Sequence, residues 1–359
     1  MGISGLGRSG WGIHADAIQA MVDRYTVAAV YDPNAGRCQS SAEALGCTAH
    51  ASLETMLADP DVELVIVASP NAHHAPQAEQ ALRAGKHVLC EKPFGLTVAD
   101  VDAMIAASEA SGKVLQPFQQ RRYAPDIRKV MDVISSGVLG EITFARIAWH
   151  GFKRRWDWQT LTECSGGDLN NNGPHVIDHA MELFGEDEPD VWCERRRCLA
   201  SGDAEDHVKI ILRGPGNPTV EVELSSVFAY SQDRWLVCGT SGALRGTGEK
   251  LEWKWVDWST MPERPVQPES TPDRSYNSEK LPWQSETWSA GGDQDAGAGA
   301  APAKQPVFDL YTDLYRSVRE GAAQTITPQS VRRRVGVMEA ARAASSIEPV
   351  AVKAASARP

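Results

Sequence analysis

The first residues of the chain impose the strongest constraint on its fold. Met1–Ser4 is a short apolar run typical of a strand, and Trp11–Val22 has the spacing of a helix. Between them, residues 5–10 read Gly-Leu-Gly-Arg-Ser-Gly, a G-x-G-x-x-G turn. After a strand and before a helix, the first glycine permits a tight turn, the second lets a pyrophosphate approach the backbone, and the third allows close packing of helix on strand. The alternative is an ordinary glycine-rich turn.

An acidic residue further along the chain favours a dinucleotide site. Asp32 ends a strand predicted over Thr26–Tyr31, at the roughly 20-residue distance from the turn where a carboxylate hydrogen-bonds the adenosine ribose. Such a carboxylate repels a 2′-phosphate, so we expect NAD in preference to NADP, with Arg37 softening that preference. The turn residues expected to bind the cofactor are Gly5, Leu6, Gly7, Arg8, Ser9 and Gly10.

Strands and helices alternate through the first 120 residues, which predicts βαβ units and a doubly wound parallel sheet, an α/β Rossmann domain. Past about residue 140, strand patterns follow one another through turns, which predicts an α+β domain with a large, mostly antiparallel open sheet. We therefore predict domains at 1–120 and 121–359, the second carrying an irregular insertion at 259–305. In the first domain the remaining strands are expected at 63–68, 87–90 and 114–118, and helices at 35–45, 72–84 and 97–111. In the second, strands are expected at 141–150, 190–198, 207–213, 219–227, 234–239 and 250–256, and helices at 174–183, 307–320 and 329–346.

Charge and cysteine content exclude several classes of function. The chain has 47 acidic and 36 basic residues, a net charge of −11, which argues against binding to nucleic acid or to an anionic membrane. No apolar run approaches the roughly 18 residues of a membrane span, and the N-terminus lacks the pattern of a signal peptide. Seven cysteines without a C-x-x-C pair predict isolated thiols in a cytoplasmic protein rather than disulfides or a metal site.

Two further segments carry residues suited to acid–base chemistry. Glu91-Lys92-Pro93 follows a predicted strand, at the sheet edge where ligands of doubly wound folds bind. Lys92 there can donate a hydrogen bond to a substrate oxygen, although a surface lysine is the simpler interpretation. Gly173 and Pro174 place His175 in the first turn of a helix, where it can act as a general base or merely pack against its neighbours. His175 and His179 also suit a zinc motif, but no third ligand is evident.

These motifs in this order resemble the Gfo/Idh/MocA oxidoreductases. The resemblance rests on the glycine turn, the segments 70–74 and 85–93, and a Gly-Gly…Gly-x-His-x-x-Asp segment at 166–178, and it spans the chain except 259–305. It implies an NAD(P)-dependent enzyme that acts on hydroxyls of a carbohydrate or polyol. It also implies a homodimer or homotetramer assembled through the C-terminal sheet.

The resemblance also implies roles for individual residues. Lys92 and His175 fall on the catalytic pair of the family, and Glu91 and Lys92 of the Glu-Lys-Pro motif are also expected to bind the cofactor. The loop beside the nicotinamide comprises Ser69, Pro70, Asn71 and His74. Many members carry Asp where this chain has Asn171, which can position a hydroxyl but cannot ionise.

Asp178 and Trp156 complete the expected substrate contacts. Asp178 would bind another hydroxyl or hold the helix, and Trp156 would stand at the substrate mouth in segment 152–158. Three functions then compete: an NAD-dependent dehydrogenase or reductase of a sugar, cyclitol or glycoside, a glycoside-cleaving enzyme that uses tightly bound NAD for transient oxidation, and a catalytically silent NAD-binding protein.

Overall fold

The N-terminal part of the chain builds a six-stranded sheet in which every neighbouring pair is parallel. The structure is a computed structural model that describes residues 1–271, 273–291 and 304–350. The strand order is β3-β2-β1-β4-β5-β6, so it reverses between β1 and β4, and ligands of doubly wound folds bind at that crevice. The strands are β1 (Gly2–Ser4), β2 (Ala29–Tyr31), β3 (Thr48–Ala49), β4 (Leu64–Val67), β5 (His87–Cys90) and β6 (Leu115–Pro117). The α/β domain is confirmed.

Helices alternate with these strands. The helix predicted over 11–22 is shorter than expected: a π-helical stretch, Gly10–Ala15, passes directly into α1, which ends at Ala20. Thr97 caps the last helix as the sequence predicts, because its side chain accepts a hydrogen bond from the Asp100 backbone N–H. The helices are α1 (Asp16–Ala20), α2 (Ala35–Leu45), α3 (Leu53–Ala58), α4 (His74–Arg83) and α5 (Val98–Ser111).

The second sheet has nine strands in the order β14-β13-β12-β11-β7-β10-β9-β8-β15. All pairs are antiparallel except β10 with β7 and β15 with β8, so the predicted mostly antiparallel sheet is confirmed. Its strands are β7 (Ile142–His150), β8 (Asp190–Arg197), β9 (His207–Arg213), β10 (Thr219–Ser225), β11 (Trp235–Gly239), β12 (Gly242–Gly246), β13 (Lys250–Trp255), β14 (Gln284–Ser289) and β15 (Ile347–Pro349).

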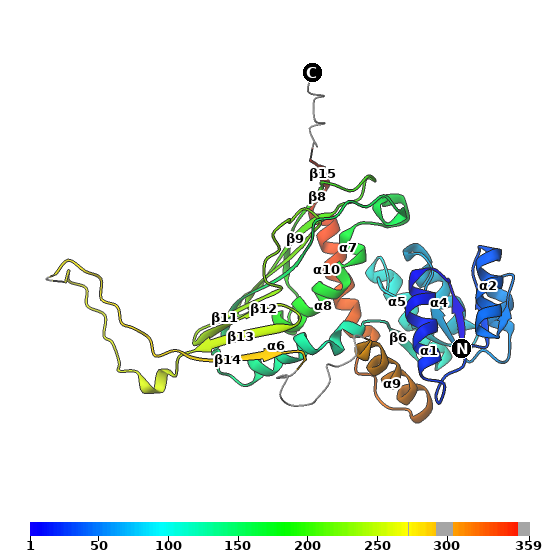
Figure 1. The fold of residues 1–359 in the computed structure, drawn as a ribbon, viewed down its shortest axis with the longest axis horizontal. Coiled ribbons are helices and arrows are strands. Elements are labelled where there is room, and N and C mark those ends of the chain that lie inside the picture. Colours follow the sequence, from blue (N-terminus) through cyan, green and yellow to red (C-terminus); the bar gives the residue numbers. More distant parts are fainter. Residues whose placement is uncertain (272, 292–303, 351–359) are drawn as a thin grey trace, which may run out of the picture.

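One face of this sheet is covered by helices, and the other carries both polar and apolar side chains, among them the exposed Trp192. Along β10, Val220, Val222 and Leu224 point into the second core, whereas Glu221 and Glu223 alternate with them on the other face. In Figure 1, α8 and α10 lie between the sheet and the N-terminal domain. The helices of this part are α6 (Pro125–Ser135), α7 (Asp168–Asn171), α8 (Gly173–Phe184), α9 (Gln305–Glu320) and α10 (Pro328–Ala344).

Two expectations about domain organisation need correction. The segment 259–305 is not irregular throughout, because β14 adds an edge strand beside β13, and α9 already begins at Gln305. Residues 292–303 of that segment lie outside the described part, and the chain between β13 and β14 extends away from the body in Figure 1. The division at residue 120 also fails for α9, whose Leu310, Tyr311 and Leu314 belong to the core of the first domain.

All seven cysteines are free thiols. Within the described ranges, no helix is both long enough and apolar enough to cross a bilayer.

Candidate active site

The glycine turn connects β1 to the first helix at the crevice of the parallel sheet. Gly5 has φ +91°, and a Cβ on it would lie 2.6 Å from the Ala68 carbonyl oxygen. A Cβ on Gly10 would lie 1.9 Å from the Gly5 oxygen, so neither position accepts a side chain without moving the backbone. A Cβ on Gly7 would meet no described atom within 4 Å. The turn therefore leaves open space at the glycine expected beside a pyrophosphate.

Asp32 lies directly after β2 and faces this turn. Its Oδ2 accepts a hydrogen bond from the Leu6 backbone N–H at 2.8 Å, and its Oδ1 accepts one from the Asn34 N–H at 2.9 Å. The half-exposed guanidinium of Arg37 lies 3.4 Å from Oδ2. Two backbone donors thus hold a carboxylate beside the glycine turn, where an adenosine ribose is expected.

Glu91 joins the glycine turn to the end of β5. Its Oε1 accepts from the Ser9 hydroxyl at 2.6 Å and contacts His14 Nε2 at 3.2 Å, and its Oε2 accepts from the Lys92 backbone N–H at 2.9 Å. Burial would raise the pKa of Glu91, but these partners, above all His14, lower it to about 2. His14 also contacts the Tyr311 hydroxyl at 2.8 Å. No local sequence pattern predicts this contact, since 297 residues separate His14 from Tyr311.

Lys92 reaches from β5 to the segment that precedes α8. Its Nζ donates to the Asn171 backbone carbonyl at 2.9 Å and lies 3.3 Å from the Asn171 side-chain oxygen. Burial lowers the pKa of Lys92, and the positive charges of Arg8, Arg121 and Arg155 act in the same direction, against the opposing effect of Glu91. The structure thus brings together two of the three residues expected to carry the chemistry.

His175 is the third, and it lies in the first turn of α8. It is 5% exposed, and its ring stacks on Trp149 with centroids 6.2 Å apart. Its Nδ1 is enclosed and has no hydrogen-bond partner among the described residues. Burial, followed by the positive charges of Lys92 and Arg121, holds the pKa of His175 well below its usual range. The ring is therefore neutral at neutral pH and able to accept a proton.

The loop after β4 closes one side of the site. The expected residues of this loop are Ser69, Pro70, Asn71 and His74. Both ring nitrogens of His74 lie 2.7 Å from carbonyl oxygens, one of Pro93 and one of Ser69. The Asn71 side chain donates to the Ser165 carbonyl at 2.9 Å. The loop therefore connects the Lys92 turn with the chain that leads into α7.

Asp178 does not fit a role in substrate binding. Its side chain is fully buried, and it forms ion pairs with Arg122 at 2.6 Å and with Arg334 at 3.1 Å. These guanidiniums come from the turn before α6 and from α10, so Asp178 connects three elements instead of facing the cleft. The expectation that it binds a substrate hydroxyl is corrected, and its alternative role of holding the helix is the one observed.

The zinc alternative loses its geometric basis. His179 Nε2 contacts the Arg121 carbonyl oxygen at 3.2 Å, and the His179 ring stacks on Trp235. Residues 1–271, 273–291 and 304–350 hold no group of three side chains placed to ligate a metal.

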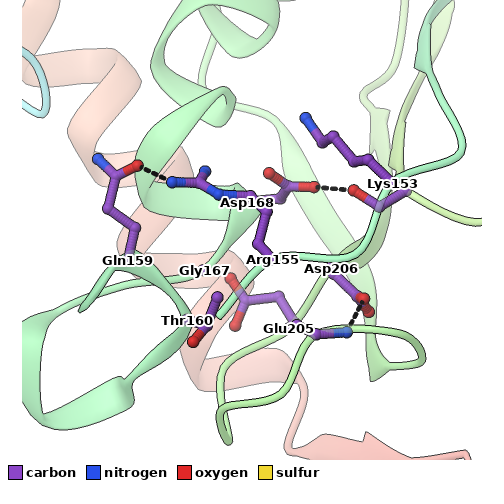
Figure 2. Close-up of a pocket in the computed structure, with 10 residues that line it drawn as sticks. Lys153, Arg155, Gln159, Thr160, Gly167, Asp168, Glu205 and Asp206 are labelled. Atoms are coloured by element: carbon purple, nitrogen blue, oxygen red, sulfur yellow. Dashed lines mark hydrogen bonds between the residues drawn. The ribbon is translucent and has the colours of Figure 1, made fainter. Parts of the chain in front are cut away.

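Trp156 stands 79% exposed in the loop that follows β7. Figure 2 shows the neighbouring pocket, with Arg155 directed toward Gln159, whose side-chain oxygen accepts its hydrogen bond at 2.6 Å. Asp168 and Glu205 line the same pocket, which encloses only about 20 Å³. That volume suits a single water, so this hollow is not the substrate chamber.

Comparison with known proteins identifies the family. Residues 1–119 match the model of the oxidoreductase family with an NAD-binding Rossmann fold, and residues 127–245 match the GFO/IDH/MocA C-terminal domain. The chain belongs to the Gfo/Idh/MocA family of oxidoreductases. Its similarity to an uncharacterised oxidoreductase of Schizosaccharomyces pombe is 26% identity over 332 residues, 89% of this chain and 88% of the relative.

Named Gfo/Idh/MocA relatives differ in their activities. A 2,7-anhydro-N-acetylneuraminate hydratase of Mediterraneibacter gnavus is 27% identical over 252 residues, 68% of this chain and 67% of the relative. A mouse trans-1,2-dihydrobenzene-1,2-diol dehydrogenase is 31% identical over 173 residues, 47% of this chain and 50% of the relative. The fold matches the WlbA dehydrogenase of Bordetella pertussis, solved with NADH and UDP-GlcNAcA, with a TM-score of 0.75 at 21% identity over 96% of this chain and 94% of that one.

Proposed function

We propose that this Gfo/Idh/MocA protein is an NAD-dependent dehydrogenase or reductase that transfers a hydride between nicotinamide and a hydroxyl-bearing carbon of a sugar, cyclitol or glycoside. The observation that carries the proposal is the contact of Lys92 with Asn171 beside the buried, neutral His175. A hydrogen-bond donor and a proton acceptor thereby meet at the carboxyl edge of a dinucleotide-binding sheet.

The residues of the crevice suit an NAD molecule. The glycine turn would hold the pyrophosphate, Asp32 the adenosine ribose, and the loop from Ser69 to His74 the nicotinamide side. NAD supplies the hydride acceptor or donor when it is bound. We propose NAD over NADP because the Asp32 carboxylate, held by two backbone N–H groups, would repel a 2′-phosphate.

The proton chemistry falls to this chain's own residues. Since His175 Nδ1 is enclosed, a substrate hydroxyl has to approach Nε2, which takes the proton during oxidation and returns it during reduction. Lys92 Nζ donates a hydrogen bond to the same oxygen and stabilises its developing negative charge. Asn171 is a positioning residue, because its carbonyl oxygens orient Nζ. Trp156 is proposed at the mouth of the site.

Lys92→Ala tests the assignment. NADH absorbance is followed with NAD or NADP and a panel of sugars, inositols and glycosides, and NADH affinity is measured by fluorescence. We expect turnover to fall by about 10²–10⁴-fold, whereas the Kd for NADH changes far less. Lys250→Ala, which removes an exposed lysine at the start of β13, is the matched control and leaves both unchanged. Wild-type turnover in Lys92→Ala would contradict the assignment.

A second candidate function is favoured by the relative named a hydratase. In that case the same residues would serve a reaction in which NAD is reduced and reoxidised within one cycle, as in redox-assisted cleavage of a glycoside. The two functions differ in net cofactor use. NADH accumulation supports the dehydrogenase, and release of free sugar without net NADH supports the alternative.

The face of the second sheet opposite its helices supports a proposal on assembly. On that face Trp192 is 45% exposed, and Lys209 pairs with Glu221 at 3.1 Å with side chains 27% and 24% exposed. We propose that this face meets another subunit in a homodimer or homotetramer, which light scattering after size-exclusion chromatography would show.

A further inference from the structure

Two arginines enclose one aromatic ring beside the proposed base. The guanidinium carbon of Arg121 lies 4.6 Å from the centroid of Trp149, and that of Arg234 lies 4.4 Å from the same centroid. The Trp149 ring in turn stacks on His175. Arg121 follows β6 of the first domain, whereas Arg234 directly precedes β11 of the second sheet. The pair therefore brings positive charge from two distant parts of the chain to one point next to the proposed base.

The negative charge at this point does not balance the positive charge. Asp126 is the carboxylate nearest to the two arginines, with its Oδ2 3.5 Å from Arg234 Nη1. The same oxygen already accepts a hydrogen bond from the Trp235 indole N–H at 3.0 Å. Asp126 therefore offsets one guanidinium at most.

The Arg121 guanidinium forms no ion pair and no hydrogen bond with the described residues. It packs on the ring of Trp149, and the charge of Asp126 also acts on it, although that carboxylate contacts Arg234 directly. Arg234 Nε and Nη2 are buried without a hydrogen-bond partner in the same part of the chain, so they are shut off from solvent, whereas no Arg121 nitrogen is enclosed in this way. An incoming group can reach Arg121 directly, and Arg234 acts on it only through Trp149.

The same excess charge extends to the catalytic groups. Arg121 contacts the Trp149 ring that stacks on His175, and its positive charge lowers the pKa of both His175 and Lys92. Lys92 has Glu91 as its carboxylate neighbour, and Asn171 beside it carries no charge. The carboxylates Glu91 and Asp126 therefore face the cations Lys92, Arg121 and Arg234, with Arg8 and Arg155 adding positive charge near Lys92, so positive charge is in excess here.

We propose that Arg121 forms a subsite for a carboxylate on the substrate, so that the enzyme acts on an acidic sugar such as a uronate. Arg121 binds the carboxylate through its planar fork of N–H donors, and Arg234 is a positioning residue that holds Trp149 against it. The planar guanidinium of Arg121, which has no ion pair of its own among the described residues, matches a planar carboxylate, to which it can donate two parallel hydrogen bonds. The proposal rests on the dehydrogenase function and names the substrate class of that site.

Binding and turnover are measured separately to test this. Galacturonate, galactose and galactose 1-phosphate are titrated calorimetrically into protein saturated with NADH, and NADH formation is followed with each compound and NAD. The variants are Arg121→Gln, which removes the charge, and Arg121→Lys, which keeps it but loses the fork. Arg83→Gln is the matched control, because it removes an equivalent charge from a side chain that is 71% exposed at the end of α4.

We expect galacturonate to bind at least tenfold more tightly than galactose or galactose 1-phosphate. Arg121→Gln should weaken galacturonate binding by about 10- to 100-fold, the range of a charge-assisted hydrogen bond, and change galactose binding by less than twofold. Arg121→Lys should recover part of the loss, and Arg83→Gln should resemble the wild type.

Equal binding of galacturonate and galactose by the wild-type protein would overturn the subsite, and this comparison needs no variant to fold. Turnover of galactose without a preference for galacturonate would overturn the subsite and leave the dehydrogenase standing. Tight, Arg121-dependent binding of galacturonate without NADH formation would support the subsite and contradict the dehydrogenase. Preference for galactose 1-phosphate would show that the site takes a phosphate and refute the carboxylate.

Discussion

Replacement of Asp178 by asparagine is expected to destabilise the protein without altering substrate recognition. The carboxylate is fully buried and accepts hydrogen bonds from Arg122 Nε at 2.8 Å and Nη2 at 2.6 Å, and from Arg334 Nε at 3.1 Å. The two arginine side chains are themselves only 13% and 7% exposed. Asparagine keeps the shape of the side chain but leaves two buried guanidiniums without their shared counterion.

The size of the effect follows from that burial. Removing one partner of a buried ion pair costs roughly 3–5 kcal/mol. Glu182 remains as a second carboxylate, in contact with Arg334 and 3.9 Å from Arg122, but it is 36% exposed and so offsets only part of the loss. We therefore expect the free energy of unfolding to fall by about 4 kcal/mol. A domain of 150–250 residues loses roughly 2–4 °C of Tm per kcal/mol, which predicts a drop of about 8–16 °C.

Thermal unfolding followed by tryptophan fluorescence measures this drop, because ten of the eleven tryptophans follow residue 148 and report on the second domain. Asp190→Asn is the control, since it breaks an exposed pair with Arg213 and should cost less than about 1 kcal/mol. A Tm within about 2 °C of wild type, together with a raised KM, would show that Asp178 binds substrate and refute the reasoning.

Two other measurements address the chemistry and the cofactor. Burial and neighbouring cations lower the pKa of His175, so its neutral form persists as the pH falls. The acidic limb of the pH profile of kcat/KM for oxidation should therefore lie below pH 6.5, the ordinary pKa of histidine. A limb above about pH 6.5 would argue against His175 as the base. Gly7→Ala should keep the wild-type Tm and weaken NADH binding about tenfold or more, because its Cβ contacts no described atom of the free protein. Gly10→Ala should lower the free energy of unfolding by about 1–3 kcal/mol, because its Cβ would clash with the Gly5 carbonyl oxygen. Equal Tm values for the two variants would contradict that distinction.

Strands bounded by strong turn signals could be predicted from the sequence, and polar edge strands could not. The bounds predicted for β5 and β9 match the structure, because apolar runs there end at Glu91 and at the turn around Pro215. β14 was missed because an exposed edge strand needs no apolar alternation. α6 was missed although Pro125 and the apolar spacing of Ile127, Val130 and Val133 indicate a helix.

The site was predictable where its residues belong to local motifs and unpredictable where it depends on long-range contacts. Lys92 follows a predicted strand and His175 lies in the first turn of a predicted helix, so local sequence patterns place both residues. The contacts of His14 with Tyr311 and of Trp149 with Arg121 join elements that no local pattern connects. Asp178 belongs to the same class, since its arginine partners lie 56 and 156 residues away.

Asn171 links the departure seen in the sequence to the charge of the site. Its side-chain oxygen lies 3.3 Å from Lys92 Nζ, so an aspartate at this position would place a carboxylate against the ammonium. At an effective dielectric constant of about 20, opposite charges at that distance attract by roughly 5 kcal/mol. The aspartate would then form an ion pair with Lys92 and neutralise its charge. Asparagine orients Nζ through the same contact without adding negative charge. The site therefore keeps its excess positive charge, which the carboxylate of the proposed acidic substrate would neutralise.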